Sequence, residues 1–191
     1  MRVAITDRSA LLIVDVQRDF MPGGPLPVPD GDSVVKPLND LIGRFESRGL
    51  PVILTRDWHP RDHISFKERG GPWPPHCVAG TEGAEFHKDL RIPRDSIIIS
   101  KATERDKEAY SGFEGTDLDD VLRKRGVRRL FVGGVATEYC VRATVMDALS
   151  SGYEVLVVEE AIKGISPEDE ERAKEEMVRK GAIIVKLDEI L

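Results

Sequence analysis

The sequence has 191 residues and a mass of 21.3 kDa, with 40% hydrophobic and 32% charged residues. This size suits one domain with a hydrophobic core of its own, and the composition excludes disordered and fibrous proteins. No apolar run approaches the roughly 20 residues that a membrane helix needs, and a net charge of −6 without a basic stripe argues against a nucleic-acid-binding surface.

Cysteine usage and the first residues bear on the compartment in which the protein works. Cys77 and Cys140 are the only cysteines, too few for a disulfide framework, so we expect free intracellular thiols. No signal-like apolar core precedes the first apolar run, which predicts a cytoplasmic protein. A single Asn and a single Gln stand beside 28 Lys and Arg and 34 Asp and Glu residues, a balance typical of thermophile proteins.

Short apolar runs alternate with helical patterns along the chain. In chain order they predict a strand at 11–14, a helix at 34–45, strands at 52–54 and 97–99, a short helix at 118–122, a strand at 130–132, a helix at 141–149, a strand at 155–158, a helix that begins at 166–167, and a strand at 182–185. Strands that alternate with helices are joined by right-handed crossovers, which predicts one α/β domain over residues 1–191. We expect a mostly parallel, six-stranded sheet with helices on both faces, a Rossmann-like arrangement of three layers.

Two segments carry patterns of their own. Residues 57–95 have no clear periodicity, and a structureless connection of this length is usually functional or disordered. Its aromatic and proline clusters and its histidines argue against disorder. In the last helix, acidic residues precede basic ones by four positions, as in Glu170 with Lys174 and Glu176 with Lys180, which predicts a solvated face of ion pairs.

Chemically useful residues follow the first four apolar runs. Asp15 follows the first run and Lys101 follows the third. Asp57 and His59 follow the second run, and the thiol-bearing segment 133–140 follows the fourth. Ligands of parallel sheets bind beyond the carboxyl ends of the strands, so we expect an acid, an imidazole, an amine and a thiol to meet at one edge.

The thiol of Cys140 permits two interpretations. Thr137 follows two glycines and precedes an apolar helix pattern, so we expect it to be the N-cap, with Cys140 in the first helical turn. The helix dipole and free N–H groups would there favour a thiolate and could hold an oxyanion. The alternative is a small buried core residue, the usual position of a free cysteine. We expect Cys77, which lies in the long segment, to be such a buried core residue.

A carboxylate and three histidines lie close together in the sequence. In an extended segment Asp57 and His59 point to the same side, while His63 follows four residues later and His76 after a loop. A lone histidine would more often be structural. A carboxylate with two or three imidazoles suits a metal, so we predict a site for one divalent ion, with Zn²⁺ as first choice and Fe²⁺ or Mn²⁺ as alternatives.

Three aromatic residues, Phe20, Trp73 and Tyr110, lie in loop-like segments near these groups. Only 6% of the residues are aromatic, so three of them near the candidate site indicate a pocket for a flat ring. Each could equally form a lid that packs on the core.

Several segments, taken in order, resemble one known family. They are LLIVDVQRDF at 11–20, TRDWHPRDHISF at 55–66, WPPHCVAG at 73–80, AYSGFEGTDL at 109–118 and GGVATEYC at 133–140. Together they resemble the nicotinamidase (pyrazinamidase) branch of the isochorismatase-like cysteine hydrolases. The resemblance spans nearly the whole chain and is specific, because the metal segment and the thiol segment are both present.

The resemblance implies a catalytic and a metal-binding set. The catalytic triad would be Asp15, Lys101 and Cys140. The metal ligands would be Asp57, His59 and His76, with His63 as a further or water-mediated ligand.

The resemblance also implies how the substrate is held. The amides of Ala136 and Cys140 would form the oxyanion hole, after a cis peptide bond between Val135 and Ala136. The substrate ring would lie between Phe20 and Trp73, with Tyr110 and Ala136 nearby.

The implied activity is hydrolysis of nicotinamide to nicotinate and ammonia, and of pyrazinamide, as a step of NAD salvage. Asp15 would take the thiol proton, Lys101 would stabilise the charges, and Cys140 would form a thioester that water then hydrolyses. The metal would orient the substrate through its ring nitrogen rather than supply the nucleophile. The partner is thus a small molecule, with no nucleic acid and no membrane, and the sequence leaves a homo-oligomer open.

Three other functions are compatible with parts of the sequence. An amidohydrolase of the same superfamily that acts on an N-carbamoyl or ureido substrate would use the thiol but no metal cluster. Vinyl-ether hydrolysis of isochorismate would need no thiol nucleophile. A non-catalytic module with a closed structural zinc site would have Cys77 bound to the metal and an unreactive Cys140.

Overall fold

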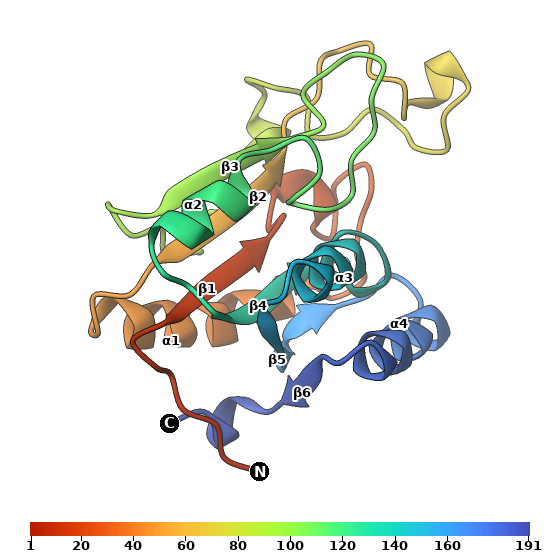
Figure 1. The fold of residues 1–191 in the computed structure, drawn as a ribbon. Coiled ribbons are helices and arrows are strands. Elements are labelled where there is room, and N and C mark those ends of the chain that lie inside the picture. The colour runs from red at the N-terminus through yellow and green to blue at the C-terminus, as the bar shows by residue number, and fades with distance from the viewer.

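Six parallel strands form the central sheet, in the order β3-β2-β1-β4-β5-β6 (Figure 1). Their bounds are β1 Ser9–Val14, β2 Val52–Asp57, β3 Ile97–Lys101, β4 Arg129–Val135, β5 Glu154–Lys163 and β6 Ile183–Val185. Every neighbouring pair is parallel, so the predicted sheet is confirmed. The computed structural model describes all residues from Met1 to Leu191.

Helices cover both faces of the sheet, as predicted. They are α1 Val35–Glu46, α2 Leu118–Lys124, α3 Arg142–Ser150 and α4 Pro167–Arg179. Alternate side chains of a strand point to opposite faces. Leu11 and Ile13 of β1 therefore pack in the cluster that contains α1, whereas Leu12 and Val14 pack in the cluster that contains residues of α2, α3 and α4. Figure 1 shows α1 on one side of the sheet and α2 and α3 on the other.

The order of the strands creates a crevice at one edge. Strand β1 has β2 on one side and β4 on the other, so the chain leaves β1 and β4 toward opposite halves of the sheet. Asp15 is the first residue after β1. The sequence placed Asp57 and Lys101 after their strands, but they are the last residues of β2 and β3 and are paired in register. Their side chains are thus fixed by the sheet itself.

The long segment between β2 and β3 forms only two short 3₁₀ turns, Lys67–Arg69 and Glu82–Ala84. Single bridges between His59 and Val78 and between Phe66 and Trp73 fold it back on itself. It gathers beyond the carboxyl ends of β2 and β3 (Figure 1). No helix in the structure combines the length and the apolar character that crossing a bilayer requires.

The prediction of ion pairs within α4 was wrong for two acidic residues, Glu170 and Glu176. Glu170 accepts a hydrogen bond from the Thr137 hydroxyl at 2.6 Å, and Glu176 pairs with Arg142 at 3.1 Å. Thr137 lies in the turn after β4, and Arg142 is the first residue of α3. Contacts between elements therefore replace the pairs that helical spacing alone predicts.

Candidate active site

Asp15 lies fully buried in the crevice. Its φ of 50° places the backbone in the left-handed region, so the chain turns sharply where β1 ends. The Thr55 hydroxyl donates to Oδ1 at 2.7 Å, and Lys101 Nζ lies 2.9 Å from Oδ2. Apart from this ion pair, Oδ2 has no partner among the protein groups, so it keeps a lone pair that can accept a proton.

Lys101 connects two carboxylates to the thiol. Its Nζ donates to Asp57 Oδ1 at 2.6 Å, lies 2.9 Å from Asp15 Oδ2 and lies 3.4 Å from Cys140 Sγ. Burial by itself would lower the pKa of Lys101, but the two carboxylates outweigh it and raise the pKa well above its ordinary value. A permanent positive charge therefore adjoins the sulfur.

Cys140 lies in one turn of π-helix, Thr137–Val141, that leads into α3. The prediction that Thr137 is the N-cap was wrong, because Ala136 occupies that position and the Thr137 hydroxyl binds Glu170 instead. The expected place of Cys140 in the first turn is confirmed. π-Helical turns often accompany functional sites.

The peptide bond between Val135 and Ala136 is cis, as the resemblance implied. The Ala136 carbonyl accepts the N–H groups of Tyr139 and Val141 at 3.1 and 3.2 Å, and so caps the turn. The Ala136 N–H donates to no protein group. An unused backbone donor thus lies in the turn that carries the thiol, where an oxyanion would develop.

The carboxyl group of Asp15 and the thiol of Cys140 lie close together, and burial acts on the pKa of both. Burial raises the pKa of the Cys140 thiol well above its ordinary value, with Lys101 opposing and the carboxylates of Asp15 and Asp57 adding to the rise. Burial also raises the pKa of Asp15. A carboxylate oxygen from each acid and the Cys140 sulfur lie within 4.8 Å of one another. Burial therefore favours the neutral thiol and raises the proton affinity of the neighbouring Asp15 carboxylate.

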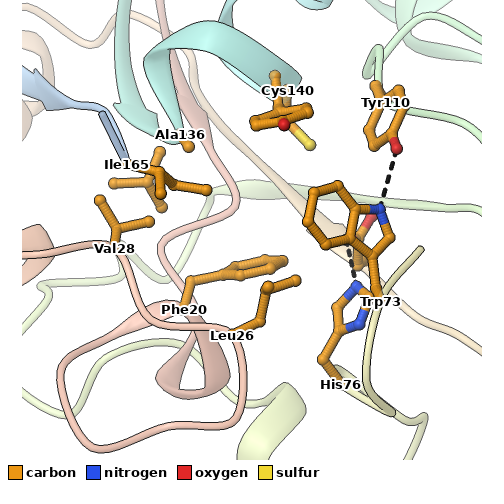
Figure 2. A pocket seen from close by; sticks show the side chains of 12 residues that line it. Phe20, Leu26, Val28, Trp73, His76, Tyr110, Ala136, Cys140 and Ile165 are labelled. Carbon is orange, nitrogen blue, oxygen red and sulfur yellow. Dashed lines mark hydrogen bonds and ion pairs between the residues drawn. The ribbon is translucent and has the colours of Figure 1, made fainter. Parts of the chain in front are cut away.

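An apolar pocket opens beside the thiol (Figure 2). Phe20, Trp73 and Tyr110 all line it, and Trp73 Nε1 donates to the Tyr110 hydroxyl at 3.0 Å. The sulfur of Cys140 points into this space. The sequence did not single out four further lining residues, which are Leu26, Val28, Tyr139 and Ile165. Tyr139 lies within the segment 133–140 next to Cys140, but Leu26, Val28 and Ile165 belong to no motif, so spacing gives no signal for these three.

Asp57, His59 and His76 bring one ligand atom each within 4.8 Å of one another. Nδ1 of His59 lies 2.9 Å from the carbonyl of Ala102, and Nδ1 of His76 lies 2.8 Å from that of Pro74. A proton donated from Nδ1 leaves the lone pair on Nε2. His59 Nε2 is buried without a hydrogen-bond partner, although Asp57 Oδ2 lies 3.4 Å away. This donor set fits a divalent metal ion.

His63 supports the cluster from behind. Its ring stacks on that of His59 with 4.1 Å between the centroids. Its Nδ1 lies 2.7 Å from the Ser65 hydroxyl, and its Nε2 lies 2.8 Å from the Lys107 carbonyl. Both nitrogens are thus hydrogen-bonded here, while a nitrogen of His63 also lies within 4.8 Å of ligand atoms of His59 and Glu108, a second group that could hold a metal ion.

The sulfur of Cys77 is not one of these donors, although Cys77 directly follows His76 and its carbonyl accepts the N–H of His59 at 3.0 Å. It is fully buried in the core, and burial raises the pKa of its thiol well above its ordinary value. Its N–H donates to the Asp19 carboxylate at 2.8 Å, and its sulfur belongs to none of the groups that could hold a metal ion. A closed zinc site with Cys77 as a ligand does not match this geometry.

Gln17 was missed by the sequence analysis as a site residue. Its side chain accepts the N–H of Asp57 at 2.8 Å and donates to the carbonyls of Asp57 and Ala84 at 2.8 and 2.9 Å. It is fully buried and joins the exit of β1 to the end of β2. The signal was available, because Gln17 is the only glutamine of the chain and lies two residues after Asp15.

Comparison with known proteins gives matches over most of the chain. A family model described as Isochorismatase domain matches residues 9–189. The nicotinamidase of Escherichia coli (strain K12) is 39% identical over 201 residues, which cover 93% of this chain and 94% of that protein. The crystal structure of pyrazinamidase of Pyrococcus horikoshii in complex with zinc has a TM-score of 0.92 and 60% identity, over 94% of this chain and 99% of that one. The crystal structure of PnC1 from L. infantum in complex with nicotinate has a TM-score of 0.94 and 33% identity, over 100% of this chain and 99% of that one.

Proposed function

This chain belongs to the isochorismatase family, and from that premise we propose that it is a nicotinamidase. It hydrolyses nicotinamide to nicotinate and ammonia, and also accepts pyrazinamide. The similarity to the nicotinamidase of Escherichia coli and to the zinc-bound pyrazinamidase of Pyrococcus horikoshii supports this proposal. The single observation that carries it is the Cys140 thiol, which faces an apolar pocket with Lys101 Nζ 3.4 Å from its sulfur.

The reaction begins with proton transfer from the thiol. Asp15 Oδ2, which pairs only with the Lys101 ammonium, accepts the proton of Cys140. The Lys101 ammonium stabilises the thiolate that remains. The sulfur then attacks the carboxamide carbon of the substrate, and the carbonyl oxygen becomes an oxyanion.

The oxyanion and the leaving group are served by different residues. The N–H groups of Ala136 and Cys140 stabilise the oxyanion of the tetrahedral intermediate. Asp15, now protonated, gives its proton to the amide nitrogen, and the C–N bond breaks to release ammonia. The acyl group stays on the sulfur as a thioester.

Hydrolysis of the thioester completes the cycle. Asp15 is ionised again after ammonia leaves, so it can take a proton from a water molecule that attacks the acyl carbon. The C–S bond breaks, the sulfur regains a proton, and nicotinate leaves. Asp15 thus acts as base, acid and base in turn, which suits a carboxyl group whose pKa burial raises.

Asp57, His59 and His76 would hold one divalent metal ion, with Zn²⁺ as the first choice because a zinc-bound relative shares 60% of its sequence with this chain. When bound, such an ion supplies a Lewis-acidic position that can hold a pyridine or pyrazine nitrogen. Asp57 and His76 both line the pocket. Phe20 and Trp73 would flank the ring there and so orient the carboxamide.

The direct test is release of ammonia from nicotinamide by the purified protein, before and after chelation of metal. We expect turnover by the wild-type protein, loss on chelation and recovery when Zn²⁺ is returned. Wild-type protein that releases no ammonia from nicotinamide in the presence of Zn²⁺ would contradict the proposal.

The main alternative is an amidohydrolase for N-carbamoyl or ureido substrates, which would use Cys140 but need no metal cluster. The buried and unpartnered Nε2 of His59 favours the metal-dependent reaction. A panel of aromatic amides and N-carbamoyl compounds separates the two, because only the alternative predicts turnover that survives chelation.

The setting of the reaction is part of the proposal. Nicotinate is the product that NAD salvage would consume, and we place the enzyme in that pathway. The cytoplasmic location and the hot habitat that the composition indicates stay predictions.

A further inference from the structure

One wall of the pocket is tied to the turn that carries the nucleophile. Ile165, which lines the pocket, belongs to the segment between β5 and α4. The Glu138 carboxylate accepts its N–H at 2.9 and 3.0 Å and accepts the N–H of Ser166 at 3.1 Å. Glu138 lies only two residues before Cys140. The Glu138 side chain therefore links this wall of the pocket to the turn that carries the sulfur.

A second contact reinforces the same junction. The Thr137 hydroxyl donates to Glu170 Oε2 at 2.6 Å, so two consecutive residues of the turn bind the start of α4. Gly164 lies enclosed between the two acids, since a Cβ there would come within 2.8 Å of Glu170 Cβ and 3.0 Å of Glu138 Oε1. The segment has little room to shift while both carboxylates are in place.

The chemistry at this junction calls for a carboxylate. Ser166 is the N-cap of α4, as the sequence predicted, and its own hydroxyl already accepts the N–H of Asp169 at 3.4 Å. The N–H groups of Ile165 and Ser166 lie before the helix and need a separate acceptor. A carboxylate offers two oxygens and is favoured near the positive end of the helix dipole.

We propose that Glu138 is a positioning residue that sets the width of the pocket through Ile165. It thereby restricts the pocket to flat, unsubstituted six-membered rings. The proposal rests on the proposed amidase function for its kinetic readout. Glu138 touches neither the substrate nor the reacting atoms, and it acts by holding the wall and the nucleophile turn at a fixed separation.

The kinetic test compares E138A and E138Q with E160A. Glu160 is a matched control, because its carboxylate also accepts a backbone N–H, that of Leu187 at 2.9 Å, but it does not line the pocket. The substrates are nicotinamide and 5-methylnicotinamide. An added methyl group in a tight apolar pocket usually costs at least about tenfold in kcat/KM, and we expect E138A to remove most of that discrimination.

The loss in E138A should lie in KM for nicotinamide, with kcat changed much less, because the triad is intact. E138Q keeps one acceptor oxygen and should restore most of the discrimination. E160A should retain the wild-type selectivity. A purely structural role of Glu138 predicts equal losses for both substrates, and that result, or an E138A variant with wild-type selectivity, overturns the proposal.

A second readout does not depend on amide hydrolysis. The rates of alkylation of Cys140 by iodoacetamide and by the bulkier N-ethylmaleimide are followed by mass spectrometry in the three variants and the wild type. A wider pocket should raise the ratio of the N-ethylmaleimide rate to the iodoacetamide rate in E138A and, more weakly, in E138Q. If the wild type hydrolyses no amide, the function fails while this ratio still decides the role of Glu138. An unchanged ratio in both Glu138 variants contradicts it.

Discussion

The triad and the metal cluster are adjacent, but the fold positions them in different ways. Asp15 directly follows β1, and Lys101 ends β3 beside Asp57, so the register of parallel strands fixes their places. The imidazoles of His59 and His76 come from the long segment and are oriented by backbone carbonyls. The triad is therefore built by the sheet, whereas the metal cluster depends on the conformation of a loop.

We expect the triad to carry out the chemical steps and the metal cluster to bind the ligand. The triad side chains exchange protons and charge with each other, so changes there should act on kcat. The cluster holds donor atoms for a ligand, so changes there should act on metal content and KM. Lys101 contacts Asp15 and Asp57 alike, and it is the one ammonium group that both regions share.

The largest expected effect comes from Cys140→Ala. Removal of the nucleophile should lower kcat by about 10⁴-fold or more, because no covalent step remains. Bound zinc, measured by atomic absorption, should stay at the wild-type level. Cys77→Ala is the control, since it removes the other buried thiol, whose sulfur belongs to none of the groups that could hold a metal ion, and it should keep activity. Normal activity in Cys140→Ala would rule out the covalent mechanism.

Asp15→Asn should have the next largest effect. The amide keeps the shape of the side chain but cannot accept the thiol proton, so kcat should fall by about 10²–10⁴-fold with zinc retained. The wild type should lose activity as the pH falls through the pKa of Asp15, because only the ionised carboxylate is a base. Burial raises that pKa, so the acidic limb of kcat/KM should lie above the ordinary range of an aspartate.

The pH profile of Asp15→Asn supplies the check on this assignment. Its residual activity should lack the acidic limb, since the titrating group is gone. A limb that persists unchanged would assign the titration to another group and would separate Asp15 from proton transfer.

His59→Ala should act on the other region. Loss of one of three ligands should weaken zinc binding by about 100-fold or more and raise KM for nicotinamide, while alkylation of Cys140 continues. Zinc affinity is measured by competition with a chelator. His87→Ala is the control, because His87 belongs to no group that could hold a metal, and it should behave as the wild type. Full zinc affinity in His59→Ala would place the metal elsewhere.

The sequence predicted the parts of the site that strand order determines. Residues at the ends of buried apolar runs must meet at one edge of a parallel sheet, which is why Asp15, Asp57 and Lys101 could be brought together without coordinates. The sequence also predicted that Asp57 and His59 point to the same side, because side chains two positions apart in an extended backbone share one side.

The sequence could not predict contacts between distant segments. Thr137 is a residue type that is common at the N-cap. Its hydroxyl instead donates a hydrogen bond to Glu170 of α4, and Ala136 occupies the N-cap position. Ile165 carries no motif, yet it lines the pocket and its N–H is bound by the Glu138 carboxylate. The sequence left the environment of Cys140 open, because the helix position of one residue does not show how deeply its thiol is buried.

The smallest expected effect concerns the ring pocket between the two regions. Tyr110→Phe removes the hydroxyl that accepts the Trp73 Nε1–H at 3.0 Å and leaves both rings in place. A hydrogen bond of this kind contributes about 1 kcal/mol, so KM for nicotinamide should rise by about fivefold, with kcat and zinc content unchanged. Steady-state kinetics and metal analysis of the same preparation measure this. If kcat fell instead while KM held, Tyr110 would act on the thiol side of the site, and the separation of binding from chemistry would not hold at the pocket.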